Sequence, residues 1–140
     1  MLIFVDTNVI IAALVRKGPV RELLLARPGS FVTAEFCIRE VWEHREEWGK
    51  GRVSDEELME ELTLMAQSIL VVVPERDYSP NEREAASLTS DPDDAPVIAL
   101  ALSMGNDGLW TFNTKDFSSV RLKEKVRVLG TREVRGLLGE

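Results

Sequence analysis

The sequence predicts a three-layer α/β/α sandwich around a central parallel sheet. Short apolar runs alternate with helical patterns along all 140 residues, without an internal repeat or a low-complexity linker. The runs are continuous in apolar residues, which is typical of parallel strands that are buried on both faces. A chain of 140 residues that is 44% hydrophobic can form one continuous core, so we expect residues 1–140 to be a single domain.

Five short strands are expected. Leu2-Ile3-Phe4-Val5 opens the chain as four consecutive apolar residues, which fit a strand buried on both faces. Ile69 to Val73 is continuous, rich in β-branched residues and ended by Pro74, so it is expected to be another buried strand. In chain order, the five predicted strands cover residues 2–5, 31–32, 69–73, 109–111 and 126–128.

Helices are predicted from capping residues and apolar spacing. Ser54 with Glu57 three residues later has the form of a capping box, and apolar residues recur at helical spacing from Leu58 to Ile69. The helix expected after residues 31–32 stops near Gly49-Lys50-Gly51. The other helices are predicted to begin at a capping residue or a proline, namely Asn8, Pro19, Thr33, Ser79, Asp94 and Thr131.

Composition excludes several classes of protein. Cys37 is the only cysteine, which excludes an intramolecular disulfide and a zinc site built from cysteines, and we expect it to be a small buried residue on a helix. No apolar run is long enough to cross a bilayer, and the N-terminus lacks the pattern of a signal peptide. We therefore expect a soluble, cytoplasmic protein with no membrane contact.

The net charge of −7 is unusual for a protein that binds nucleic acid. It does not exclude such binding, because carboxylates that hold divalent cations make a protein acidic and the metal then attracts phosphate. Lysines and arginines cluster between Lys115 and Arg127, a run that more often forms a solvated face than a binding patch.

Four acids fall where a parallel sheet would bring them together. Asp6 ends the first strand, Glu40 lies on the helix after the second, Asp94 begins the helix before the fourth, and Asp116 follows the fourth. Crowded carboxylates repel one another unless cations lie among them, and ligands that are all oxygen favour Mg²⁺ or Mn²⁺. Each acid alone is more often a cap or a solvated charge, so the joint placement carries the prediction.

Four segments in this order and spacing resemble the PIN domain family, over nearly the whole chain. They are residues 4–10 (FVDTNVI), 38–41 (IREV), 94–101 (DAPVIALA) and 109–117 (LWTFNTKDF). The resemblance implies a metal-dependent ribonuclease that uses Mg²⁺ or Mn²⁺ on an RNA substrate, as in VapC-like toxins, and it raises the possibility of an antitoxin protein as partner. We also expect a homodimer, because the predicted helices carry more apolar surface than one small core needs.

The resemblance also assigns residues. Asp6, Glu40 and Asp94 match three of the family's acids, whereas Asn113 occupies the usual position of the fourth, which is a departure. We rank Asp116 above Asn113 for this fourth role, because a carboxylate adds charge for the cation and an amide does not. Supporting hydrogen bonds to the acids or to a substrate phosphate are expected from Thr7, Asn8, Thr111 and Asn113.

The expected chemistry is hydrolysis of single-stranded RNA, in which one or two cations orient and deprotonate water for in-line attack. A haloacid-dehalogenase-like phosphatase is disfavoured, because Asn8 stands where its proton-donating Asp would be. A receiver domain is disfavoured because Asp6 has no partner acid beside it. A catalytically weak or inactive PIN-like module that binds nucleic acid or supports an assembly stays open through Asn113. His44, the sole histidine, is left out of the catalytic set.

Overall fold

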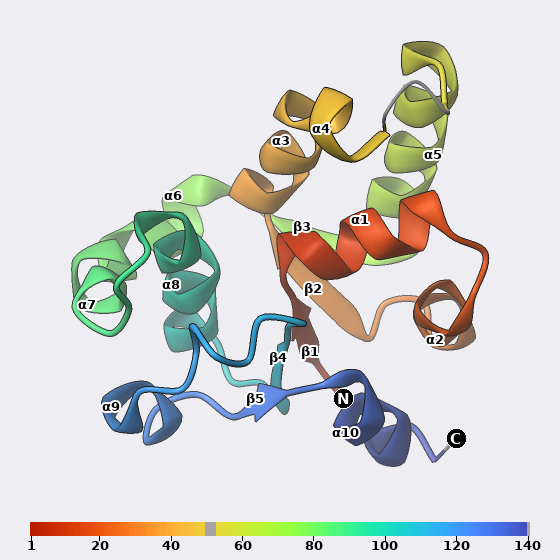
Figure 1. Ribbon diagram of the computed structural model, residues 1–140. Coiled ribbons are helices and arrows are strands. Elements are labelled where there is room, and N and C mark those ends of the chain that lie inside the picture. Colours follow the sequence, from red (N-terminus) through yellow and green to blue (C-terminus); the bar gives the residue numbers. More distant parts are fainter. Residues whose placement is uncertain (50–52, 140) are drawn as a thin grey trace.

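The computed structural model describes residues 1–49 and 53–139. In these residues, five parallel strands form one sheet in the order β3-β2-β1-β4-β5 (Figure 1). The strands are β1 (Ile3–Val5), β2 (Phe31–Ala34), β3 (Leu70–Val73), β4 (Gly108–Trp110) and β5 (Val128–Leu129). The predicted sandwich with a central parallel sheet is therefore confirmed.

Helices cover both faces of the sheet. Helices α1, α2 and α5 pack together on one side, and α6, α7 and α8 pack together on the other, where α8 lies against β1 and β2 (Figure 1). Within the described ranges the helices are α1 (Thr7–Val15), α2 (Pro19–Ala26), α3 (Glu35–Glu43), α4 (Arg45–Gly49), α5 (Asp55–Ser68), α6 (Glu75–Tyr78), α7 (Glu82–Ala86), α8 (Ala95–Ser103), α9 (Val120–Lys123) and α10 (Thr131–Leu137), with 3₁₀ turns η1 (Ser79–Asn81) and η2 (Pro92–Asp94).

The core is centred on β1 and β4. Every residue of β1 is fully buried, as expected for a strand covered on both faces. Trp110 of β4 is also fully buried, with its ring centroid 5.8 Å from that of Phe31, and its indole N–H donates to Thr131 Oγ1 at 3.1 Å. Cys37 is a free, buried residue of α3, as predicted. This packing fixes the carboxyl edge of the sheet, where the candidate site lies.

Three predicted caps are wrong. Asp6, and not Asn8, is the N-cap of α1, and its side chain accepts a hydrogen bond from the Thr7 N–H. Thr33 lies inside β2, where its hydroxyl donates to the Val5 carbonyl at 2.9 Å, and α10 has Gly130 as its N-cap instead of Thr131. In each case a neighbouring residue takes the cap, because strand pairing and core packing fix the local backbone more strongly than capping preference does.

Other predicted boundaries also shift. The helix expected from Thr33 to the Gly49 region is divided at His44 into α3 and α4; Lys50 and Gly51, part of its predicted stop, lie outside the described residues. The helix expected from Ser79 is the 3₁₀ turn η1 followed by the short helix α7, because Pro80 has no N–H for an α-helical hydrogen bond. Helix α6, which directly precedes Ser79, was not predicted.

The sheet edges also differ from the prediction. The fifth strand is Val128–Leu129 and so begins later than predicted. Val71 of β3 is 45% exposed, so the expectation of a strand buried throughout is wrong there. Strand β3 lies at the edge of the sheet, where one side of the strand has no neighbouring strand.

Candidate metal centre

Asp6 is held in one orientation at the end of β1. Its side chain is only 8% exposed. One carboxylate oxygen accepts from the Thr7 N–H and the other from the Thr111 hydroxyl, both at 2.8 Å. Its own N–H donates to the Trp110 carbonyl at 3.0 Å. Burial raises the pKa of Asp6 above its ordinary value, although both hydrogen bonds oppose that change.

Glu40 projects from α3 toward the same edge. The Thr7 hydroxyl donates to Glu40 Oε1 at 2.6 Å, so Thr7 touches both Glu40 and Asp6. Burial also raises the pKa of Glu40, with further contributions from the charges of Asp93 and Asp6. Residues from α1 and α3 are thereby linked around two of the predicted acids.

Asp94 is the most strongly perturbed acid of the group. It is 9% exposed and stands at the N-cap of α8, but it makes no capping hydrogen bond with its side chain. Its Oδ2 atom is buried and has no hydrogen-bond partner among the described residues. Burial raises the pKa of Asp94 to about 7, and the nearby carboxylates Asp6, Asp91, Asp116 and Glu40 add to the effect.

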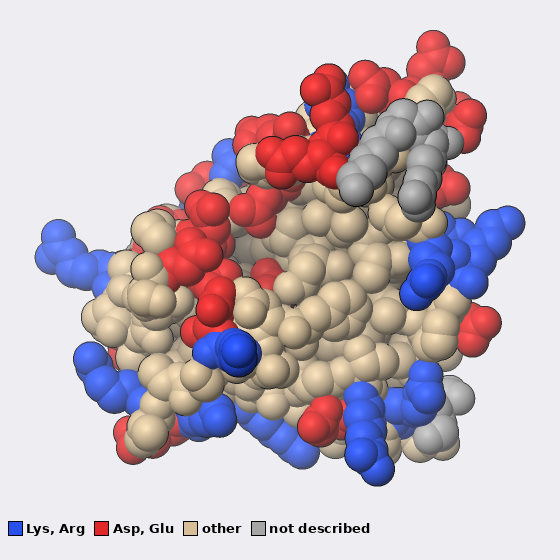
Figure 2. Space-filling view, in the orientation of Figure 1, with Lys and Arg blue, Asp and Glu red and all other residues tan. Residues whose placement is uncertain are grey.

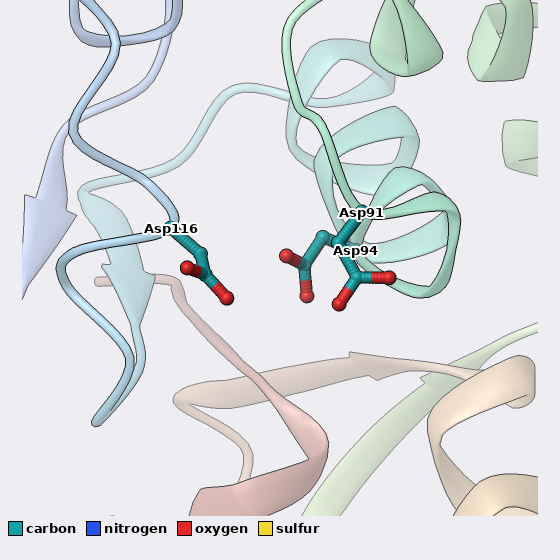
Figure 3. A group of neighbouring side chains, drawn as sticks. All are labelled: Asp91, Asp94 and Asp116. Atoms are coloured by element: carbon teal, nitrogen blue, oxygen red, sulfur yellow. The ribbon is translucent and has the colours of Figure 1, made fainter.

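A close cluster joins Asp94 to two other acids. One carboxylate oxygen from each of Asp91, Asp94 and Asp116 lies within 4.8 Å of the others, and Figure 3 shows Asp116 facing the other two from a separate loop. Asp91 is not among the four acids predicted from the sequence. Its position beside Asp94 comes from η2, because residues three apart in a 3₁₀ turn lie above one another.

Asn113, at the family's fourth position, is hydrogen-bonded to Asp116. Its side-chain amide donates to Asp116 Oδ2 at 2.5 Å, and its backbone N–H donates to the Thr111 hydroxyl at 3.1 Å. Of the two candidates for the fourth ligand, Asp116 is the one whose carboxylate lies in the cluster. Its assignment as the fourth metal ligand, in preference to Asn113, stays a prediction.

Hydrogen bonds link Thr111 to these acids and Asn8 to Thr111. Thr111 is fully buried and donates to Asp6 Oδ2. The Asn8 side chain reaches Thr111 Oγ1 at 3.5 Å and accepts from the Phe112 N–H at 3.3 Å. The four residues expected to support the site thus all lie beside it, through contacts with the acids or with one another.

Several polar residues lie outside the cluster. His44 is exposed and pairs with Glu47 at 3.3 Å. Asp93 is exposed on the same turn as Asp94 and borders a hollow that Glu40 and His44 also line. In Figure 2, red acidic side chains gather along one side of a hollow, and one further acid is visible within it.

The donor set suits a hard divalent cation. The side chains that converge here are carboxylates, and Asp94 has a buried oxygen without a partner among the described residues. A cation between the carboxylates would satisfy that oxygen and remove the repulsion. Oxygen ligands of this kind favour Mg²⁺ or Mn²⁺ over softer metals.

The fold and the site together define an α/β domain with a carboxylate cluster at the carboxyl edge of its sheet. The PIN domain family model matches residues 4–135, and the chain belongs to this family. Members of the family are generally metal-dependent nucleases. The resemblance seen in the four sequence segments is therefore confirmed.

A solved structure described as a toxin-antitoxin complex from Klebsiella pneumoniae contains a similar chain. The TM-score is 0.65 with 18% sequence identity, and the match covers 94% of this chain and 98% of that one. This likeness shows a shared fold. A search of curated proteins gave no match. None of the helices in the described residues has the length and apolar character needed to span a bilayer.

Proposed function

We propose that this protein is a Mg²⁺- or Mn²⁺-dependent endoribonuclease that cleaves single-stranded RNA. The observation that carries the proposal is the environment of Asp94, a buried carboxylate with an unpartnered oxygen and other carboxylates around it. Such an arrangement is costly in a folded protein unless a cation balances it. Family membership supports nuclease chemistry, and the preference for RNA rests on the resemblance.

Each of the four predicted acids has a task in this proposal. Asp6, Glu40, Asp94 and Asp116 would hold the cation, which when bound would supply Lewis acidity at the scissile phosphate and promote ionisation of the attacking water. Thr7 and Thr111 keep Asp6 and Glu40 in place through the hydrogen bonds described above. Water attacks phosphorus directly, the bond from phosphorus to one bridging ribose oxygen breaks, and that oxygen leaves as a hydroxyl group on taking up a proton, so no side chain acts as a nucleophile.

A polar groove beside Asp116 offers a path for the substrate. Its walls carry hydroxyl groups and two cationic side chains, from Ser87, Thr89, Ser90, Lys115, Ser118, Ser119 and Arg121. Lys115 and Arg121 provide positive charge for phosphates on an otherwise acidic protein. Because Asp116 lines the same groove, a single-stranded RNA bound in this groove would reach the acid cluster.

Protein partners are part of the proposal. The Klebsiella pneumoniae chain was solved in a toxin-antitoxin complex, and this supports an antitoxin-type partner for the present chain. Leu25 and Leu64 are more than half exposed and border one apolar groove where α2 meets α5, a surface suited to an apolar segment of another protein. The homodimer stays a prediction.

The test is cleavage of labelled single-stranded RNA with Mn²⁺ or Mg²⁺. Wild type is expected to cleave RNA, to lose activity in excess EDTA and to prefer RNA over DNA of the same sequence. Asp6→Asn is expected to reduce the rate at least about 100-fold, since loss of groups that only orient metal ligands already costs 10–100-fold. Asp77→Asn, at an exposed acid on α6, is the matched control and should cleave like wild type.

Two results would contradict this proposal in different ways. Full activity of wild type in excess EDTA would exclude a metal-dependent mechanism. Absence of cleavage on several RNAs, together with absence of Mn²⁺ binding by calorimetry, would favour the second candidate function, an inactive PIN-like module that binds nucleic acid or supports an assembly. Asn113 at the fourth family position is the observation that favours this second candidate.

Thr111→Val tests how the site is positioned. The change keeps the shape of the side chain but removes the hydroxyl that donates to Asp6 Oδ2. We expect Mn²⁺ affinity to fall roughly 10-fold, because partners that orient a metal ligand have effects of this order. Thr111→Ser retains the hydroxyl and should bind Mn²⁺ nearly as wild type does. Equal affinity of Thr111→Val and wild type in calorimetry would show that the hydroxyl does not position Asp6.

A further inference from the structure

We propose that Asp91 is a further ligand of the divalent cation, at a position outside all four segments that carry the family resemblance. The inference rests on the proposed function, since it concerns the same metal centre. It adds Asp91 to the acids around the proposed cation, beside Asp94 and Asp116, so that an acid contributed by the η2 turn adds to those already named.

The local backbone fixes Asp91 beside Asp94. Asp91 is the N-cap of η2, where its Oδ1 accepts from the Asp93 N–H at 3.0 Å. The Asp94 N–H donates to the Asp91 carbonyl at 3.0 Å and closes the turn. A 3₁₀ turn places residues three apart above one another, so both carboxylates leave the turn on the same side. Figure 3 shows these two side chains together, opposite Asp116.

The buried, unpartnered oxygen of Asp94 is a second observation that points to a cation at this cluster. More than nine-tenths of this residue is buried, and its Oδ2 is without a hydrogen-bond partner in residues 1–49 and 53–139. An oxygen of this carboxylate lies within 4.8 Å of oxygens from both Asp91 and Asp116. A buried, charged oxygen that lacks a donor is costly, and a cation shared with the two neighbours removes this cost.

Asn113 replaces the acid at the family's fourth position, so a carboxylate from elsewhere in the chain is needed to supply its charge. At the family's four positions this chain has only three carboxylates, those of Asp6, Glu40 and Asp94. Asn113 contributes no charge, and its amide donates a hydrogen bond to Asp116. Asp91 lies across the cluster from that loop and adds a negative charge close to Asp94. Together with Asp116, it supplies carboxylate charge that the family's fourth position lacks in this chain.

Asp93 is a matched control in the same turn. It has the same side chain and formal charge as Asp91, but it is exposed and lies outside the cluster. Its carboxylate borders the hollow on the Glu40 side instead. Any effect of general surface charge on cation binding should therefore appear in both Asp93→Asn and Asp91→Asn, whereas an effect of ligation should appear only in the latter.

The experiment is titration of the metal-free protein with Mn²⁺ in a calorimeter, at fixed pH and ionic strength. Wild type, Asp91→Asn and Asp93→Asn are compared, and the melting temperature of each metal-free protein is measured. Asn retains an oxygen that can accept from the Asp93 N–H, so Asp91→Asn should keep the turn. We expect its Mn²⁺ affinity to fall on the order of tenfold or more, and that of Asp93→Asn to stay within about twofold of wild type.

Each possible outcome is decisive. If wild type binds Mn²⁺ and Asp91→Asn binds equally well, the inference is overturned while the proposed function stands. Equal weakening in Asp91→Asn and Asp93→Asn would also overturn it, because the effect would then be one of general charge. Asp91→Ala separates capping from ligation, since weak binding by Asp91→Ala but normal binding by Asp91→Asn would assign Asp91 to the turn alone. Failure of wild type to bind Mn²⁺ would overturn the proposed function as well.

Discussion

Asp94→Asn is expected to stabilise the metal-free protein at neutral pH while it abolishes RNA cleavage. The neutral amide removes a negative charge that is buried among other carboxylates, and it also removes a proposed ligand of the cation. We expect a gain of about 2 kcal/mol in the free energy of unfolding at pH 7.5, or roughly 5 °C or more in melting temperature. Cleavage and thermal unfolding of the same preparation measure the two effects.

The pH dependence gives this prediction a definite sign. The pKa of Asp94 rises from 3.8 in the unfolded chain to about 7 in the folded protein, mainly through burial. The folded state therefore holds the proton more tightly, and the contribution of Asp94 to stability is greatest below pH 4 and is lost as the pH rises through 7. The stability difference between Asp94→Asn and wild type should be small at pH 4 and should grow up to neutral pH.

Mn²⁺ should reverse the order of stability. The cation binds the folded wild type and should raise its melting temperature, whereas Asp94→Asn should respond much less. Asp93→Asn, at the exposed neighbour, is the control and should follow wild type with and without the metal. If Asp94→Asn is less stable than wild type at pH 7.5 without metal, the carboxylate is not a source of destabilisation and this account of the site is wrong.

Trp110→Ala is expected to cost about 3–5 kcal/mol of stability. The residue is fully buried at the centre of the sheet, packs on Phe31 and donates to Thr131, so its removal leaves a large cavity and an unsatisfied hydroxyl contact. A loss of this size is a large part of the roughly 5–15 kcal/mol that stabilises a typical domain. Urea unfolding followed by circular dichroism measures it.

Two milder variants separate packing from hydrogen bonding at Trp110. Thr131→Val removes only the acceptor of the indole N–H and should cost about 1 kcal/mol, since the bond is partly buried. Trp110→Phe keeps much of the ring volume and should fall between Thr131→Val and Trp110→Ala. A cost for Trp110→Ala similar to that of Thr131→Val would show that the cavity collapses and that packing contributes little.

Much of the fold followed from the sequence because its strands are short, continuous and apolar. The run ending at Val5 could be recognised as a buried strand, so the place of Asp6 at the sheet edge followed as well. Caps were less predictable, since Asp6, Thr7 and Asn8 are all plausible at the start of α1. Pairing with β4, through the bond from the Asp6 N–H to the Trp110 carbonyl, decides which of them stands at the N-cap.

The candidate site was predictable only where a residue follows a strand or matches a family segment. Asp91 does neither. Its proximity to Asp116 depends on the 3₁₀ conformation of η2 and on the path of the loop after β4, and both are tertiary outcomes. The raised pKa of Asp94 likewise depends on how deeply α8 is packed, and sequence spacing carries no information about that depth.

Asp6 and Asp94 both occupy N-cap positions, one at the start of α1 and one at the start of α8. The N-terminus of a helix carries partial positive charge from N–H groups that lack partners within the helix. Two such ends therefore offset part of the negative charge at the sheet edge before any ion arrives. On the proposed function, the cation can therefore bind after the domain has folded, and we expect a newly made chain to be folded but inactive until it does.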